Sequence, residues 1–152
     1  MRRPGTGTTI LTGTNTCTGG TTITQGTLQL GNGTTNGSII GNVADNGTLA
    51  FDRSDTVTYG GVISGSGAVN QIGTGTTVLT GTNSYTGPTT VSGGALYVNG
   101  DQTAATGATT VQSGATLGGT GTVGGNITIA SGGTLAPGGV GGAILRRQTS
   151  SQ

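Results

Sequence analysis

The residues able to do acid–base or metal chemistry are few in this sequence of 152 residues. Its only carboxylates are Asp45, Asp52, Asp55 and Asp101. A pair of carboxylates with a basic partner is what polysaccharide-cleaving enzymes use, and FDRSD places Asp52 and Asp55 close together around Arg53. Three residues apart on an extended strand, two side chains lie on opposite faces. The spacing therefore favours a solvated, charged corner over a catalytic pair.

The sequence also lacks the residues that other kinds of catalytic, metal-binding or phosphate-binding site require. The sequence has no histidine, which excludes Ser-His catalysis and His-based zinc sites. GNVADNG around Asp45 does not recur as calcium-binding repeats do, and one aspartate supplies too few oxygen ligands. GTGTTV lacks the GK[ST] of a phosphate loop. Cys17 has no second cysteine to pair with. We predict no catalytic, metal or cofactor-binding site, no cofactor, and no enzyme activity.

Charge and hydropathy exclude further classes. Charged residues make up 6% of the chain and the net charge is +1, so the sequence lacks the basic surface that binds nucleic acid. No apolar run approaches the length of a membrane span. The start MRRPGTG is basic but has no apolar segment behind it, so we expect no signal peptide in this chain.

One long phrase occurs twice in the sequence. GTGTTILTGTNTCTGGTTITQGTLQLG at 5–31 and GTGTTVLTGTNSYTGPTTVSGGALYVN at 73–99 agree at sixteen of 27 positions without a gap. Leu28 and Leu30 of the first copy stay apolar in the second, whereas Gln29 between them becomes a tyrosine. Repetition at this level indicates stacked structural units, and the period of two indicates strands packed on one face.

The same alternation marks the predicted core. Glycine and threonine disfavour helix, whereas threonine, valine and isoleucine suit strands, so the fold class is all-β. The apolar positions that we expect to face inward are Leu28, Leu30, Leu49, Phe51, Val69, Leu96, Val98, Leu117, Ile127, Ile129 and Leu135.

A shorter motif sets the architecture. Gly-x-Leu or Gly-x-Val recurs, with GATL at Gly114 as a one-residue variant. The aliphatic residues follow one another from Leu28 to Leu135 in steps of 21, 20, 27, 21 and 18 residues. Roughly twenty residues is the length of one coil of short strands, which predicts a β-solenoid. A sandwich of hairpins is the competing all-β fold, but it has no reason to repeat the phrase. Disorder in isolation is the other alternative, because the apolar content is low.

The polar positions have expected places as well. Asn-Gly pairs at Asn32, Asn36, Asn46 and Asn99 fit corners that need positive φ. Outward threonines are expected to stack between coils. Cys17 aligns with Tyr85 of the second copy, so we expect an ordinary side-chain position there and not a reactive thiol. Tyr85 and Tyr97 are expected to lie outward, where they shield the strand face more than they contact a ligand.

Both copies of the phrase, with GVISGSGAVNQIGTGTTVLTG and TLGGTGTVGGNITIASGGTLAPG beside them, resemble a known repeat. It is the passenger-associated β-strand repeat of autotransporters, the type V secretion systems of Gram-negative bacteria. The resemblance runs from residue 5 to about residue 139. Cys17 stands where it has tyrosine, Pro88 where it has glycine, and ILRRQTSSQ lies outside it. The resemblance implies a right-handed parallel β-helix in a secreted or cell-surface protein associated with the outer membrane.

From these observations we predict three regions. They are a disordered end at 1–4, a β-solenoid at 5–139 that carries the repeats at 5–31 and 73–99, and a polar, basic tail at 140–152. The partners expected are neighbouring β-helix coils of a longer parent chain, with the outer-membrane barrel elsewhere and any surface ligand unknown.

The resemblance also implies a function. It is a structural segment of the passenger that promotes folding and secretion by stacking coil on coil. An adhesin-like or ice-binding surface and a polysaccharide-cleaving enzyme are the alternatives. Ice binding would need the Thr-x-Thr motif on one face of every coil, and here it recurs only at the long period.

Overall fold

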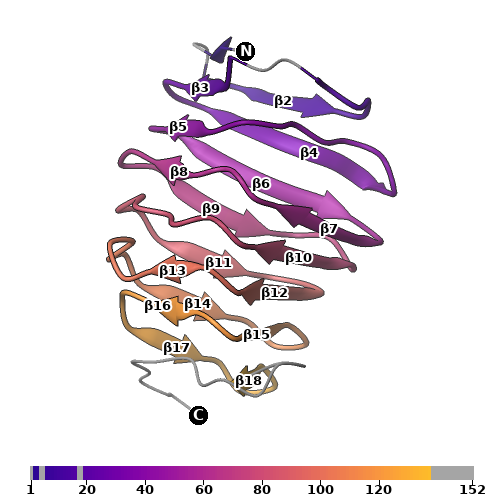
Figure 1. Cartoon of the computed structure of the whole chain (residues 1–152). Coiled ribbons are helices and arrows are strands. Elements are labelled where there is room, and N and C mark those ends of the chain that lie inside the picture. The colour runs from indigo at the N-terminus through magenta and orange to yellow at the C-terminus, as the bar shows by residue number, and fades with distance from the viewer. Residues whose placement is uncertain (1, 4–5, 17–18, 138–152) are drawn as a thin grey trace.

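The chain forms a column of stacked parallel strands in a computed structural model that describes residues 2–3, 6–16 and 19–137 (Figure 1). The amino-terminal strands lie at one end of the column and the carboxy-terminal strands at the other. The described residues contain no helix, and so none that could span a membrane. The predicted all-β, parallel β-solenoid is confirmed; its right-handedness stays a prediction.

One sheet, here called the long sheet, runs the length of the column. Its strands pair in parallel, each with the strand one coil away, in the order β17-β14-β11-β9-β6-β4-β2. They are β2 (Thr8–Leu11), β4 (Thr27–Thr34), β6 (Thr48–Arg53), β9 (Ala68–Gln71), β11 (Thr89–Val91), β14 (Thr109–Val111) and β17 (Ile127–Ile129).

Three shorter sheets close the other sides. The second sheet contains β7 (Thr56–Tyr59), β10 (Thr76–Leu79), β12 (Ala95–Val98), β15 (Thr116–Gly119) and β18 (Thr134–Pro137). The third contains β1 (Arg2–Arg3), β3 (Thr21–Ile23), β5 (Val43–Asp45) and β8 (Ile63–Ser64), and the fourth β13 (Asp101–Gln102) and β16 (Thr122–Val123). The disordered end predicted at 1–4 does not hold for Arg2–Arg3, which pair with Thr22 and Ile23. The predicted tail at 140–152 lies outside the described residues.

The interior is filled by the inward side chains of successive coils. Leu28 pairs with Leu49, and Leu49 with Val69, so one aliphatic column rises through the long sheet. Leu96 and Leu117 begin a second column that ends at Leu135, in the second sheet. Of the eleven positions expected to face inward, all are buried except Leu135, which is partly buried against the same core. Burying one such side chain stabilises the fold by about 1.5–3 kcal/mol.

The two copies of the long phrase lie on different sheets. Strand β4 of the first copy is in the long sheet, whereas its counterpart β12 is in the second sheet. In its own column Val69 is followed by Thr89, not by Leu96. The step of 27 residues between Val69 and Leu96 is therefore one coil plus the passage to the next face. The aliphatic residues of the Gly-x-Leu motif therefore form two columns, one in the long sheet and one in the second sheet.

The Asn-Gly corners divide into two kinds. Gly33 and Gly37 have the predicted positive φ, at 92° and 101°. The prediction is wrong for Gly47 and Gly100, which have no positive φ. At these two glycines a Cβ atom would stand 2.3 Å from a backbone carbonyl oxygen of the previous coil. Glycine is required there because the backbones approach too closely for any side chain.

Candidate functional site

The segment 81–87, GTNSYTG of the second copy, joins β10 to β11 across the side of the third sheet. Backbone N–H groups of Ser84 and Thr86 donate to the carbonyl oxygens of Ile63 and Gly65, both at 2.9 Å. Without being a regular strand, the segment adds one more rung beyond β8. The inward side chains of this rung form the candidate site.

Asn83 is the first residue of the rung with an inward side chain, and it has no exposed surface. Its Oδ1 accepts a hydrogen bond from the backbone N–H of Ile63 at 2.8 Å. Its Nδ2 has no hydrogen-bond partner. The equivalent residue of the first copy, Asn15, donates from Nδ2 to the carbonyl oxygen of Ser38 at 3.2 Å. In both copies, therefore, the asparagine side chain bonds to the backbone of the following or preceding coil.

Tyr85 follows two residues later and is also buried, with 2% of its surface exposed. The prediction that it lies outward is wrong. Its hydroxyl lies 2.6 Å from Oγ1 of Thr89 and 3.5 Å from Oε1 of Gln102, and all three side chains are buried. Burial raises the pKa of Tyr85 to about 12, so the phenol stays neutral. A neutral phenol between a hydroxyl and an amide joins adjacent coils and offers no acid–base chemistry.

Two other positions singled out by the sequence are Tyr97 and Cys17. Tyr97 occupies an outward position of β12 and is half-buried. A Cβ atom on Gly118, which pairs with it in β15, would lie 3.1 Å from its ring, so the ring covers the neighbouring strand. Cys17 lies outside the described residues.

Asp45 at the end of β5 is the one aspartate inside the column. It has no exposed surface; Oδ1 accepts from the backbone N–H of Gly47 at 3.1 Å, and Oδ2 has no partner. Burial raises the pKa of Asp45 to about 6, against the lowering effect of its hydrogen bonds with the backbones of Gly47 and Leu49. No group of three potential metal-ligating residues occurs in the described part of the chain.

Asp52 and Asp55 are bound to different partners. Arg53 donates from Nε and Nη2 to the two oxygens of Asp55, at 2.9 and 2.8 Å, and from Nη1 to the carbonyl oxygen of Gly37 at 2.9 Å. The Arg53 hydrogen bond holds the pKa of Asp55 below its usual value. Asp52 accepts instead from Nε2 of Gln29 at 3.1 Å. The arrangement is an ion-paired corner, and it leaves Asp52 and Asp55 without a shared proton or substrate position.

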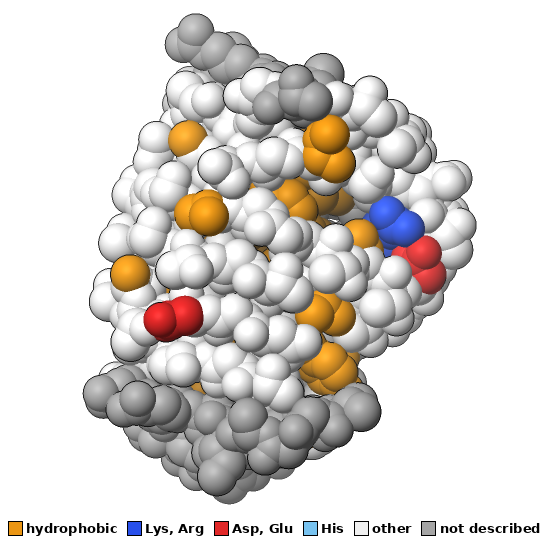
Figure 2. All heavy atoms as spheres, viewed as in Figure 1, with side chains coloured by type: hydrophobic (Ala, Val, Ile, Leu, Met, Phe, Trp, Pro, Cys, Tyr) orange, Lys and Arg blue, Asp and Glu red, His pale blue; other side chains and the backbone are white. Residues whose placement is uncertain are grey.

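Asp101 is exposed and closes a local turn. Its Oδ1 accepts from the backbone N–H of Thr103 at 3.0 Å and from the hydroxyl of the same residue. These bonds, the hydroxyl first, hold the pKa of Asp101 below its usual value. Figure 2 shows how sparse charge is on one face of the column, where most of the surface is uncharged.

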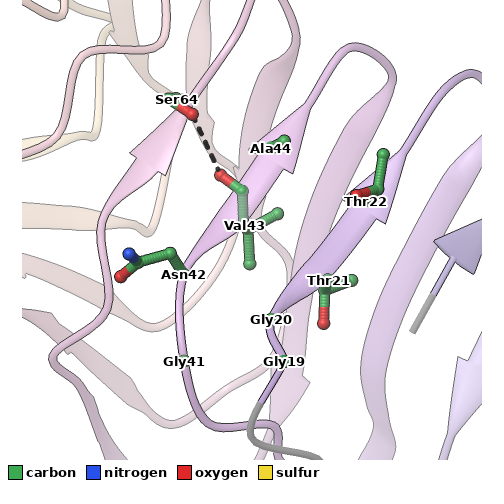
Figure 3. A pocket seen from close by; sticks show the side chains of 9 residues that line it. All are labelled: Gly19, Gly20, Thr21, Thr22, Gly41, Asn42, Val43, Ala44 and Ser64. Carbon is green, nitrogen blue, oxygen red and sulfur yellow. Dashed lines mark hydrogen bonds between the residues drawn. The ribbon is translucent and has the colours of Figure 1, made fainter.

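A shallow groove of about 350 Å³ lies on the outer side of the third sheet (Figure 3). Small side chains on neighbouring strands line it, and Ser64 donates from its hydroxyl to the carbonyl oxygen of Val43 at 3.4 Å. None of its residues is charged or aromatic. They are Gly19, Gly20, Thr21, Thr22, Gly41, Asn42, Val43, Ala44 and Ser64.

Sequence reasoning missed the inward polar residues, although the sequence carries a signal for them. From Thr77 to Val91 every second residue is buried, without a break through GTNSYTG. Extending the strand period through this segment would have placed Asn83 and Tyr85 inside. Another buried polar contact joins Thr77 and Gln71: the Thr77 hydroxyl donates to Oε1 of Gln71 at 2.6 Å. No periodicity identifies this partner pair, because the two residues lie on different sheets of one coil.

Comparison with known proteins agrees with the two-copy pattern. The family model described as passenger-associated-transport-repeat matches residues 5–30 and 69–98. Over 60 residues, 40% of this chain, the sequence is 56% identical to a protein of Brucella suis biovar 1 (strain 1330) named "Adhesin BmaC autotransporter". The chain spans 1% of the length of that relative. No solved structure matches.

The second matched segment, 69–98, contains the rung with Asn83 and Tyr85. Two segments of the chain therefore match the passenger-associated-transport repeat. Together with the similarity to an autotransporter adhesin, this match supports an autotransporter passenger repeat in this chain.

Proposed function

We propose that this segment is a structural part of a larger exported passenger and promotes the passenger's folding and secretion by stacking coil on coil. The role is non-catalytic. Its partners are the adjacent coils of the same parent chain.

The observation that carries this proposal is the change of face between the two repeats. Residues 69–98 place their strands one sheet further round the column than residues 5–30 do. The inward residues nevertheless correspond: Leu28 and Leu96 are both buried, and so are Ile23 and Val91. What the repeat keeps constant is its interior, and not a surface presented to one side. A ligand-binding repeat would be expected to keep its outward residues on a common face.

The interior also supplies a folding mechanism. Each coil buries the inward side chains of its neighbour and offers a row of backbone groups about 4.8 Å away for the next coil to pair with. Stability in such a stack is a sum over adjacent units, so order can spread from coil to coil. A chain that emerges from a membrane unfolded can thus fold without an external energy source. The low charge and the lack of disulfides suit such a passage.

The proposal is tested by Leu96→Asp in the exported protein, with Ser92→Asp as the matched control. Leu96 is buried in β12, whereas Ser92 is exposed four residues earlier. Surface delivery is measured by protease treatment of intact cells followed by antibody detection. Leu96→Asp should lose both the protease-resistant segment and surface delivery. Native-like delivery of a Leu96→Asp passenger that has lost its resistance would contradict the secretion role.

An adhesin-like surface is the second candidate, favoured by the name of the Brucella relative, which is called an adhesin. The described surface offers uncharged threonines, half-buried Tyr97 and the shallow groove, and none of these defines a ligand class. Binding of the purified full chain to cultured epithelial cells separates the two candidates. Saturable binding that survives Leu96→Asp unchanged would point to contacts outside the folded stack, and saturable binding lost with the fold would support adhesion.

A further inference from the structure

The chain contains four Asn-Gly pairs, the dipeptide in which an asparagine carboxamide most readily cyclises onto the next backbone nitrogen, since glycine offers no steric hindrance. They begin at Asn32, Asn36, Asn46 and Asn99. All four lie among the described residues, and their surroundings differ. The comparison among them is the basis of the inference.

Asn46 and Asn99 are held by the next coil. Oδ1 of Asn46 accepts from the backbone N–H and the hydroxyl of Ser66, at 3.0 and 3.2 Å. Oδ1 of Asn99 accepts in the same way from Thr120, at 3.0 and 3.3 Å. The nitrogens that would have to attack are engaged too: the Gly47 N–H donates to Asp45, and the Gly100 N–H to the carbonyl oxygen of Leu79.

Asn36 is exposed, but the glycine after it is locked. Gly37 is buried, and a Cβ atom there would lie 2.3 Å from the backbone nitrogen of Gly31 and 2.4 Å from the carbonyl oxygen of Leu11. The Gly37 carbonyl oxygen also accepts from Nη1 of Arg53. The peptide unit cannot turn to bring its nitrogen onto the Asn36 side chain without breaking these contacts.

Asn32 and Gly33 are the exception. Both are exposed, and a Cβ atom on Gly33 would meet nothing within 4 Å. The register between β4 and β6 shifts between Leu30 and Thr34, so no paired residue of β6 faces Asn32 or Gly33. Oδ1 of Asn32 accepts from the hydroxyl of Thr34 at 3.1 Å, which draws electrons from the carboxamide carbon.

We propose that Asn32 is a spontaneous deamidation site, and that the other three Asn-Gly pairs are protected by the fold. The backbone nitrogen of Gly33 bonds to Cγ of Asn32 and loses its proton, while the Cγ–Nδ2 bond breaks and ammonia leaves. Water then opens the cyclic imide at either carbonyl. Opening at one carbonyl gives aspartate, and opening at the other gives isoaspartate.

The modification adds a negative charge near the end of β4, where Thr34 pairs with Arg53, in a chain whose net charge is +1. A Cβ atom on Gly33 would meet nothing within 4 Å, so there is open space on that side of the changed peptide bond. Under the function proposed above, the exported segment would accumulate this surface charge with age.

The test is to incubate the full folded chain in mildly alkaline buffer and to follow acid formation at each asparagine by peptide mass spectrometry with electron-transfer fragmentation. One hydrogen bond to break corresponds to about a tenfold lower rate, so Asn32 should react at least about tenfold faster than Asn36, Asn46 and Asn99. The same chain in urea should modify all four pairs at comparable rates. Asn32→Gln should abolish the reaction in the folded chain, because glutamine cyclises far more slowly.

Comparable rates at all four sites in the folded chain, or faster reaction at Asn46 or Asn99, would overturn the proposal. So would an unmodified Asn32 in folded chain when the urea sample reacts. Protease resistance of the incubated sample, measured in parallel, shows that the compared chain is folded.

Discussion

The side chain of Asn83 occupies the interior of the solenoid and hydrogen-bonds the backbone N–H of Ile63, one coil away, at 2.8 Å. The third sheet ends with β8, so no backbone carbonyl of a further strand accepts the hydrogen bond from the Ile63 N–H. The Asn83 side-chain oxygen accepts it instead. In the second copy the asparagine therefore serves the interior of the column.

Replacing Asn83 should accordingly cost more than replacing an exposed asparagine. Asn83→Ala leaves the Ile63 N–H buried without a partner, and we expect a loss of about 1–3 kcal/mol in the free energy of unfolding. Asn126, whose side chain is exposed, is the matched control, and Asn126→Ala should change stability little. Urea denaturation followed by circular dichroism measures both. Equal effects of the two variants would show that the Ile63 contact is not stabilising.

The Tyr85 hydroxyl makes a separable contribution. Tyr85→Phe keeps the ring in the core and removes the 2.6 Å contact with Thr89, so a loss of about 1 kcal/mol is expected. Tyr85→Ala removes the ring as well and should cost about 3–5 kcal/mol, the usual cost of truncating a buried aromatic. Thermal melts of both variants check the order. A Tyr85→Ala variant as stable as Tyr85→Phe would mean that the ring is not packed.

How much of this was predictable from the sequence depends on the residue. The strand period placed Leu28, Leu49 and Leu96 because an apolar residue next to a polar one has only one favourable side. It failed at Tyr85, because threonine, glycine and asparagine look alike in a strand and in a loop. The change of sheet between Val69 and Leu96 was visible only as an irregular step of 27 residues, since sequence alone does not show on which face a coil turns.

The glycines that allow close approach give a clean comparison. A Cβ atom on Gly87 would stand 2.2 Å from the carbonyl oxygen of Gly67, a backbone atom that can move only if the coils separate. Gly87→Ala should therefore be strongly destabilising, by about 2 kcal/mol or more. Gly19, where a Cβ atom meets nothing within 4 Å and φ is not positive, is the control. Gly19→Ala should be neutral; a Gly87→Ala chain with an unchanged melting temperature would refute the close contact between coils.

The buried carboxyl of Asp45 predicts an unusual pH dependence. Its pKa is about 6 in the folded chain and 3.8 in the unfolded chain, so between these values the folded state binds more protons. Stability should consequently fall as pH rises from about 4 to about 6 and level off above, by at most about 3 kcal/mol. Asp55 and Asp101 have lowered pKa values, so their stabilising contributions are lost only as the pH falls below about 4, outside this window.

Asp45→Asn tests the assignment, because an amide of the same shape carries no charge at any pH in this range. The variant should be more stable than the parent chain at pH 7, and its stability should be flat between about pH 4 and 6. Exposed Asp101→Asn is the control and should keep the parent's slope. The measurement is the urea midpoint at a series of pH values. If the Asp45→Asn chain still loses stability across that window, another group titrates there, and the interior of the solenoid tolerates the Asp45 charge.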